Sequence, residues 1–207
     1  NVDKGIFING KTEVVATDID ASNGVIHVID NVLLPPTMDI VDIASGSDDF
    51  STLVTAVAKA GLVDALKMDG PYTVFAPTNE AFADFLGEFN LTVEALLAVE
   101  NRDLLTSVLL YHVVPARVFS TDLEDGLDAP TLLEDKEIEV ELRGKVHRVL
   151  LEDEAGRTVP TKPNGLNILA TNGVIHTINN VLFPFEVDDD EDDYDDDDDE
   201  DDEDDED

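Results

Sequence analysis

Apolar residues in the first half of the chain recur every three or four positions, which is the spacing of an amphipathic helix. Four segments show this pattern, each preceded by residues that can cap a helix N-terminus: residues 50–60, 81–86, 93–99 and 103–114. Gly61 interrupts the first segment, and Pro115 follows the last, because proline cannot continue a helix. We therefore predict that residues 47–115 are mainly helical.

From about residue 131 the spacing of the apolar positions changes to two. Ile138, Val140 and Leu142 alternate with charged side chains, as in a strand with one face in water. Gly144 and Lys145 can form a hairpin turn into the next strand. Short strands are predicted at residues 73–75, 146–151, 157–159, 166–169 and 174–182. Together the two patterns predict an α+β fold that combines helices with an antiparallel sheet.

One segment of 13 residues occurs twice in the chain. The sequences NGVIHVIDNVLLP at residues 23–35 and NGVIHTINNVLFP at residues 172–184 agree at 10 of 13 positions, 149 residues apart. Such a period suits one domain of ordinary size, with the repeated segment as its closing element. Only 22 residues precede the first copy, so we expect it to end a truncated domain. We also expect the chain, which begins at Asn1 within this pattern, to be a piece of a longer protein.

The last 22 residues are almost entirely acidic. Every residue from position 186 to 207 is Asp or Glu except Val187 and Tyr194, so the segment has 20 carboxylates and no basic side chain. Like charges repel, and little apolar surface is available to offset backbone ordering of about 1–2 kcal/mol per residue. We predict a disordered poly-Asp/Glu tail at residues 186–207.

The rest of the chain is also acidic, with a net charge of −17 for residues 1–185. This charge disfavours nucleic acids and anionic lipid surfaces as partners, because both are polyanions. Cations, basic proteins and mineral surfaces are the natural counterparts, and a salt-adapted source is an alternative explanation. The chain has no Cys, so disulfides and thiolate metal sites are excluded. No run of about 18 apolar residues occurs, so direct membrane insertion is not expected.

Three segments, in order along the chain, carry a resemblance to a known family. They are TVFAPTNEAF at residues 73–82, the pair Tyr111-His112, and NGVIH at residues 172–176. The segments IVDIA at residues 40–44 and FSTLV at residues 50–54 fit the same pattern. On these segments the chain resembles the fasciclin domain family over residues 37–185.

The resemblance implies a fasciclin-type wedge of two packed antiparallel β-sheets with a small helical layer. It implies a complete domain at residues 37–185, while residues 1–36 resemble the C-terminal fragment of a preceding fasciclin domain. Family members occur in tandem on cell-surface and matrix proteins that mediate adhesion. We therefore expect a noncatalytic adhesion module that is extracellular, on a cell surface, or in another exported compartment such as a periplasm or lumen. Its partners would be a protein or matrix ligand, other copies, or neighbouring fasciclin domains.

The pair Tyr111-His112 is the first candidate contact for a partner. The resemblance implies this role, because the pair with its flanking aliphatic residues is a candidate integrin contact in animal members. The alternative is a packing role, since a His among aliphatic neighbours is commonly a buried, hydrogen-bonded residue.

An Asp-Ile pair ahead of the NGVIH segment is the second candidate contact that the resemblance implies. Asp18-Ile19 matches it in the first copy, whereas Asn167-Ile168 stands at that place in the complete domain. The carboxylate is therefore missing from the complete domain, which argues there against an integrin-type contact.

The family-signature residues are expected to be structural. They are Thr73, Phe75, Pro77, Thr78, Asn79, Phe82, Asn172, Gly173 and His176. Thr78 or Asn79 can accept hydrogen bonds from the next helical turn, and Phe75 and Phe82 can reach one core. His27 occupies the same repeat position as His176, and the sequence has no HExxH, GxSxG or nucleotide-binding glycine motif. We expect no metal site in the folded domain and no enzymatic activity.

The acidic tail supports a second hypothesis, in which the protein binds calcium or calcium mineral. Consecutive carboxylates supply oxygen ligands for weak and diffuse Ca²⁺ binding, on residues that include Asp188, Asp189, Asp190, Asp195, Asp196 and Asp197. The alternative for the tail is a solvated terminus. A third hypothesis is a structural subunit on the exported face of a membrane complex, such as a photosynthetic assembly. Asn90 begins an N-x-[ST] pattern, a glycosylation site if a eukaryote secretes the protein.

Overall fold

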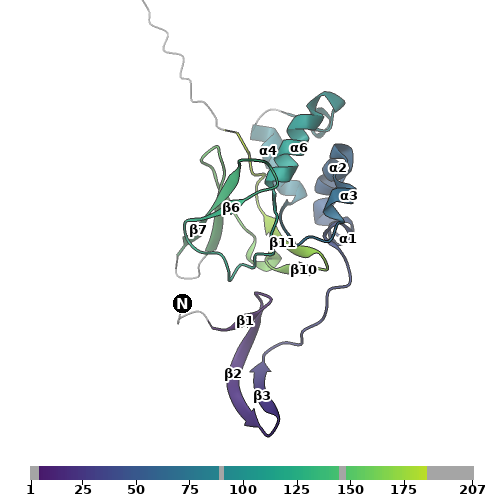
Figure 1. Cartoon of the computed structure of the whole chain (residues 1–207). Coiled ribbons are helices and arrows are strands. Elements are labelled where there is room, and N and C mark those ends of the chain that lie inside the picture. Colours follow the sequence, from purple (N-terminus) through teal and green to yellow (C-terminus); the bar gives the residue numbers. More distant parts are fainter. Residues whose placement is uncertain (1–4, 89–90, 145–147, 186–207) are drawn as a thin grey trace, which may run out of the picture.

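The structure is a computed structural model that describes residues 5–88, 91–144 and 148–185 (Figure 1). Its strands are β1 (Phe7–Ile8), β2 (Thr12–Ala21), β3 (Gly24–Ile29), β4 (Tyr72–Pro77), β5 (Val113–Val114), β6 (Leu127–Pro130), β7 (Glu137–Arg143), β8 (Arg148–Glu152), β9 (Thr158–Pro160), β10 (Ile168–Ala170) and β11 (Gly173–Ile178). Its helices are α1 (Ile40–Ser45), α2 (Ser51–Ala60), α3 (Val63–Leu66), α4 (Asn79–Glu88), α5 (Val93–Leu96) and α6 (Arg102–Tyr111). Three 3₁₀ turns are described: η1 (Asp48–Phe50), η2 (Val99–Asn101) and η3 (Pro163–Gly165).

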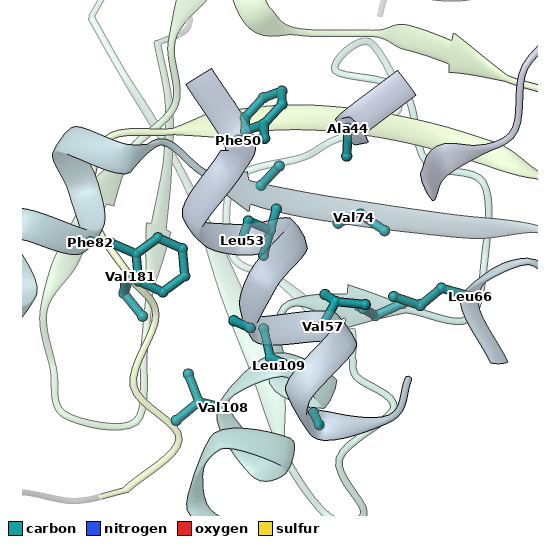
Figure 2. Packing of buried hydrophobic residues seen from close by; sticks show 14 of the residues in the cluster. Ala44, Phe50, Leu53, Val57, Leu66, Val74, Phe82, Val108, Leu109 and Val181 are labelled. Carbon is teal, nitrogen blue, oxygen red and sulfur yellow. The ribbon is translucent and has the colours of Figure 1, made fainter. Parts of the chain in front are cut away.

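The described residues from α1 onward form three layers. Helices pack on one face of a four-stranded sheet of order β10-β11-β4-β5, and a second sheet of order β6-β7-β8-β9 packs on its other face. Figure 2 shows Leu53 and Val57 of α2 pointing toward Val74 of β4 in the core between helices and sheet. The core between the two sheets contains Phe75 of β4 and Ile138 of β7. Strand β4 thus serves both cores, because its side chains alternate between its two faces.

The helical layer agrees with the pattern of apolar positions in most places. The four predicted helices correspond to α2, α4, α5 with η2, and α6. Gly61 ends α2 in the left-handed conformation (φ 78°), which glycine adopts without steric cost. Two short helices, α1 and α3, were not predicted from periodicity, since six and four residues are too few to show a helical period. The expected α+β class with a small helical layer is confirmed.

One ladder departs from the expected antiparallel arrangement. Strand β11 pairs with β4 in parallel, with Gly173 opposite Tyr72 and Ile178 opposite Pro77, while the other ladders of the two four-stranded sheets are antiparallel. Helices α4, α5 and α6 and the second sheet lie between these two strands in the chain, and this long connection returns the chain to the same end of the sheet, as parallel pairing requires. Strand β11 also ends at Ile178, four residues before the end of the predicted strand at 182.

Before α1, residues 7–29 form a separate three-stranded sheet of order β1-β2-β3. Figure 1 shows this sheet projecting from the layered part of the molecule near β10. The Asn167 side-chain amide joins the two parts by donating a hydrogen bond to the Gly10 carbonyl oxygen at 2.9 Å. The predicted boundaries of the N-terminal fragment (residues 1–36) and of the complete domain (residues 37–185) stay a prediction. The predicted tail lies outside the described residues.

Candidate functional site

Tyr111, in the first candidate contact, is buried at the end of α6. Its side chain is 0% exposed, and its hydroxyl donates a hydrogen bond to the Glu137 carbonyl oxygen on β7 at 2.8 Å. Its ring packs with Phe75 between the two sheets. Burial raises the pKa of the Tyr111 hydroxyl, and the carboxylates of Glu154 and Asp153 raise this pKa further. No partner can touch this side chain while the domain stays folded.

His112 is buried beside Tyr111 and holds two backbone segments together. Its Nε2 accepts a hydrogen bond from the Leu182 amide at 3.0 Å, and its Nδ1 lies 2.7 Å from the Val108 carbonyl oxygen. An amide only donates, so Nε2 is unprotonated and the proton sits on Nδ1, which donates to Val108. Burial lowers the pKa of His112 to about 4, although the Val108 carbonyl opposes this shift.

The lowered pKa of His112 predicts that mild acid destabilises the domain. The unfolded chain binds a proton near pH 6.5, the ordinary pKa of His, and the folded domain binds it only near pH 4. The contribution of His112 to stability is therefore complete above pH 6.5 and is lost as the pH falls toward about 4, by about 3 kcal/mol in total. Urea unfolding between pH 7 and 4 measures this loss.

A matched pair of variants isolates this effect. His112→Gln should flatten the decline of stability with falling pH, while His27→Gln, at an exposed position, should keep the decline of the parent. Some decline should remain in His112→Gln, because burial also lowers the pKa of His176. Parallel curves for His112→Gln and the parent would contradict the assignment to His112.

The nine signature residues lie inside the fold, where they connect elements. All are buried except Asn79, which is partly buried. The Thr73 hydroxyl donates to a carbonyl oxygen after β5 at 2.6 Å and accepts from an amide two residues later at 2.9 Å. The Asn172 side chain accepts from the first amide of α1 at 3.0 Å and donates to two carbonyl oxygens at and just after the end of α3, at 2.8 and 3.0 Å. The Thr78 hydroxyl caps α4 through the Ala81 amide.

The two Asp/Asn-Ile pairs share one backbone geometry. Asp18 and Asn167 both have positive φ values, 57° and 56°, and each donates its amide hydrogen to Nδ1 of a His nine residues later at 3.2 Å. These acceptors are His27 and His176, the equivalent histidines of the repeat. The resemblance between the two copies therefore extends from the sequence to the local structure.

The same two pairs differ in exposure. Asn167 is 8% exposed, and its side chain bonds to the amide and hydroxyl of Ser120 and to Gly10. Asp18 is exposed, and Ile19 beside it is 45% exposed. Of these two pairs, Asp18-Ile19 therefore presents a carboxylate and an apolar side chain on the surface, and Asn167-Ile168 does not.

Asp18 and Ile19 lie on a hairpin whose two faces both carry exposed apolar side chains, which we call together the hairpin surface. It comprises the exposed apolar residues of β2, β3 and the segment after β3: Val15, Ile19, Val25, Ile26, Val28, Val32, Leu33 and Leu34. Each is at least 40% exposed. Sequence reasoning named only Ile19 among them. The other residues could have been found by aligning the two copies of the repeat, because each copy has apolar residues that a complete domain would bury.

Other candidate sites find no support in the described residues. There, no three His, Asp or Glu side chains gather closely enough to hold a metal ion. In the same ranges no helix has the length and apolar character needed to cross a membrane. Asn90 and the aspartates of the tail lie outside the described residues, so their predicted roles stay predictions.

Comparison with known proteins identifies the family. The Fasciclin domain model matches residues 1–35 and 48–184. Protein sll1483 of Synechocystis sp. is 38% identical over 157 residues, which cover 76% of this chain and 79% of that protein. Transforming growth factor-beta-induced protein ig-h3 of Sus scrofa is 37% identical over 172 residues, 83% of this chain but only 23% of ig-h3.

A solved structure of a FAS1 domain pair, from the insect cell adhesion molecule Fasciclin I, has the same fold. It superposes with a TM-score of 0.63 at 18% identity, covering 84% of this chain and 61% of that one. At this identity the superposition shows the fold alone, whereas the matching family model spans both copies of the repeated segment. The chain belongs to the fasciclin domain family.

Proposed function

We propose that the chain is a noncatalytic protein-binding module that acts in adhesion and that its hairpin surface contacts the partner. The observation that carries this proposal is the exposure of apolar cross-strand neighbours. Ile19 on β2 is paired with Ile26 on β3, and their side chains are 45% and 53% exposed. Extended apolar patches of this kind on a soluble protein mark sites of protein contact, because covering them releases water from apolar surface.

The polar surroundings of the hairpin surface add selectivity for the partner. Asp18 places a carboxylate next to Ile19, and Asp20 follows on the same strand. With a net charge of −17 over residues 1–185, the module favours a partner with basic groups at the rim of the contact. Nucleic acids and anionic membranes are disfavoured for the same reason.

Relatives support an adhesive role in an exported compartment. The solved FAS1 domain pair comes from a protein described as an insect cell adhesion molecule. Adhesion requires exposure outside the cell that makes the protein, so we place this module on a cell surface, in a matrix, or in a comparable exported space. This placement is part of the proposal.

Attachment of the producing cells to a surface coated with the full chain tests the proposal. Combined replacement Asp18→Asn and Ile19→Ser should weaken attachment about fivefold or more, since a contact near the centre of an interface contributes over about 1 kcal/mol. Leu104→Ser is the matched control, because Leu104 is 40% exposed but lies on α6. Equal attachment to the parent and to the double variant would contradict the role of the hairpin surface.

The calcium hypothesis for the tail remains a second candidate that rests on the sequence. Closely spaced carboxylates attract divalent cations, and without a preformed cage the binding should be weak and sensitive to salt. This activity would accompany adhesion and would not replace it, because the tail and the hairpin surface are separate parts of the chain.

A further inference from the structure

A cavity of about 240 Å³ lies between the helices and the sheet of order β10-β11-β4-β5, and we call it the helical cavity. Helices α1, α2, α3 and α6 and strand β4 contribute to its walls. Ala44, Val57, Leu66 and Val74 are four of the lining residues that Figure 2 labels. Protein interiors are close-packed, with few voids larger than a water molecule. The helical cavity is therefore large enough to hold a ligand.

The lining of the helical cavity is almost entirely apolar. Apart from Ser45, Tyr72 and His112, every lining residue is aliphatic or Met. His112 has no hydrogen-bonding capacity to spare, because its two ring nitrogens already contact the Val108 carbonyl oxygen and the Leu182 amide. Ser45 is exposed, and Tyr72 is partly buried. Water in a cavity needs about two to four polar partners, so this lining favours apolar contents.

Small side chains line the helical cavity on several sides. Ala44 of α1, Ala58 of α2, Ala65 of α3 and Ala76 of β4 all contribute to its walls. Four elements each contribute an alanine, so the space results from the way these elements pack and not from one small residue. Atoms that face an empty space lack dispersion partners on that side, and an apolar ligand would supply them.

The helical cavity reaches the surface of the domain. Met68 and Leu132 line it, and these two residues are 61% and 36% exposed. Because part of the lining is in contact with solvent, a ligand does not have to cross a fully buried layer to enter.

The charges around the helical cavity favour a neutral ligand. Burial lowers the pKa of His112 to about 4, so this lining residue is uncharged at neutral pH. Lys67 lies between two lining residues in the sequence, but its ammonium group already pairs with the carboxylates of Asp39 and Asp42, at 3.4 and 2.8 Å. An anionic ligand would also be repelled by the net charge of −17 over residues 1–185.

We infer that the helical cavity binds a small, neutral, apolar molecule of about ten carbon atoms. An engineered apolar cavity of about 150 Å³ binds benzene, and the same ratio of volume to carbon atoms gives about ten carbon atoms for 240 Å³. Transfer of the ligand from water to an aliphatic lining favours binding. The inference goes beyond the proposed function, because the hairpin surface lies on other elements and contacts a protein partner.

Naphthalene is a neutral hydrocarbon of the inferred size and tests the inference. Calorimetric titration of the full chain with naphthalene should show saturable binding of one molecule per chain. Val54→Phe adds a ring to the wall that α2 contributes and should weaken this binding about tenfold or more, because the ring occupies the space of the ligand. Val93→Phe is the matched control and should leave the affinity unchanged, because Val93 is 37% exposed on α5 and does not line the cavity.

Three further measurements sharpen the test. Ala65→Phe fills the cavity from an exposed position on α3, and it provides the comparison if Val54→Phe fails to fold. Naphthoate has the same rings with a carboxylate, and it should bind about tenfold or more weakly than naphthalene. Combined replacement Ile19→Ser and Ile26→Ser should leave naphthalene binding unchanged, which separates the helical cavity from the hairpin surface.

The inference is overturned if naphthalene shows no saturable binding to the full chain. A folded filling variant that binds naphthalene as tightly as the parent overturns it too, as does loss of binding in Val93→Phe or equal binding of naphthoate. Loss of binding in the Ile19→Ser, Ile26→Ser variant would place naphthalene on the hairpin surface and has the same consequence. Cell attachment of the Asp18→Asn, Ile19→Ser variant tests the proposed function separately from all these results.

Discussion

Replacing Tyr111 by Ala is expected to lower the free energy of unfolding by about 3–5 kcal/mol, the range for removal of a buried aromatic side chain. The ring is 0% exposed and packs between the two sheets, so its loss leaves a cavity that close-packed neighbours cannot fill. The hydrogen bond from its hydroxyl to the Glu137 carbonyl oxygen is lost as well. Urea unfolding followed by circular dichroism gives the change directly.

Tyr111→Phe is the matched variant, because it keeps the ring and removes only the hydroxyl. Its expected cost is about 1–3 kcal/mol, for a buried carbonyl oxygen left without its donor. If Tyr111→Ala unfolds like the parent protein but reduces cell attachment, Tyr111 is an exposed contact and its buried placement is wrong.

The larger elements could be predicted because their signals are local. Gly61 marked the end of α2, and the alternation around Val140 marked a strand with one buried face. The helix predicted to run to Pro115 ends earlier, at Tyr111, and Val113–Val114 form strand β5. Helix α1 was not predicted, since its six residues contain fewer than two turns. The sequence nevertheless contains a signal for its start, Asp39, whose side chain accepts a hydrogen bond from the Asp42 amide and caps the helix.

The parallel pairing of β11 with β4 could not be predicted from periodicity. A strand buried on both faces shows an apolar run whether its neighbour is parallel or antiparallel, and here the partners are about 100 residues apart. Strand order depends on how the intervening layers pack, and this information is spread over the whole chain.

The candidate contacts were predicted as residue pairs, but their exposure depends on tertiary structure. Asp18-Ile19 and Asn167-Ile168 have equivalent places in the repeat and equivalent local geometry. Asn167 is buried because Ser120 and Gly10 approach it from other parts of the chain. No property of the pair itself could reveal those neighbours.

Asp153 is the important residue that sequence reasoning missed. The chain has 49 acidic residues, and nothing in the local sequence distinguishes Asp153, which the fold buries, from the exposed acidic residues of the described ranges. Its carboxylate is 0% exposed and forms an ion pair with Arg157 at 2.8 Å. It also accepts hydrogen bonds from the backbone amides of Ala155, Arg157 and Phe183. One side chain thus connects the turn before β9 to the segment after β11.

Replacing Asp153 by Ala is expected to destabilise the domain by about 3–5 kcal/mol, because it leaves three backbone amides without their acceptor and removes the nearest counter-charge of the partly buried Arg157 guanidinium. The Arg157 guanidinium would retain the Val181 carbonyl oxygen at 3.0 Å and the distant Glu88 carboxylate at 3.5 Å. The Arg157 guanidinium also packs against the Phe85 and Phe183 rings, with its Cζ atom 5.8 and 5.5 Å from their centroids, and the Arg157 side chain is only 21% exposed.

Salt and a surface variant distinguish this buried interaction from general charge effects. A buried pair is screened little, so the loss in Asp153→Ala should persist in 1 M sodium chloride, where the Debye length is about 3 Å. Asp84→Ala, at an exposed position on α4, also removes one negative charge, and it should change the free energy of unfolding by no more than about 0.5 kcal/mol. Thermal unfolding of both variants at low and high salt provides the comparison. Equal stabilities for the two variants would mean that Asp153 acts only through net charge, and the segment after β11 would then have to be held in place by its apolar side chains alone.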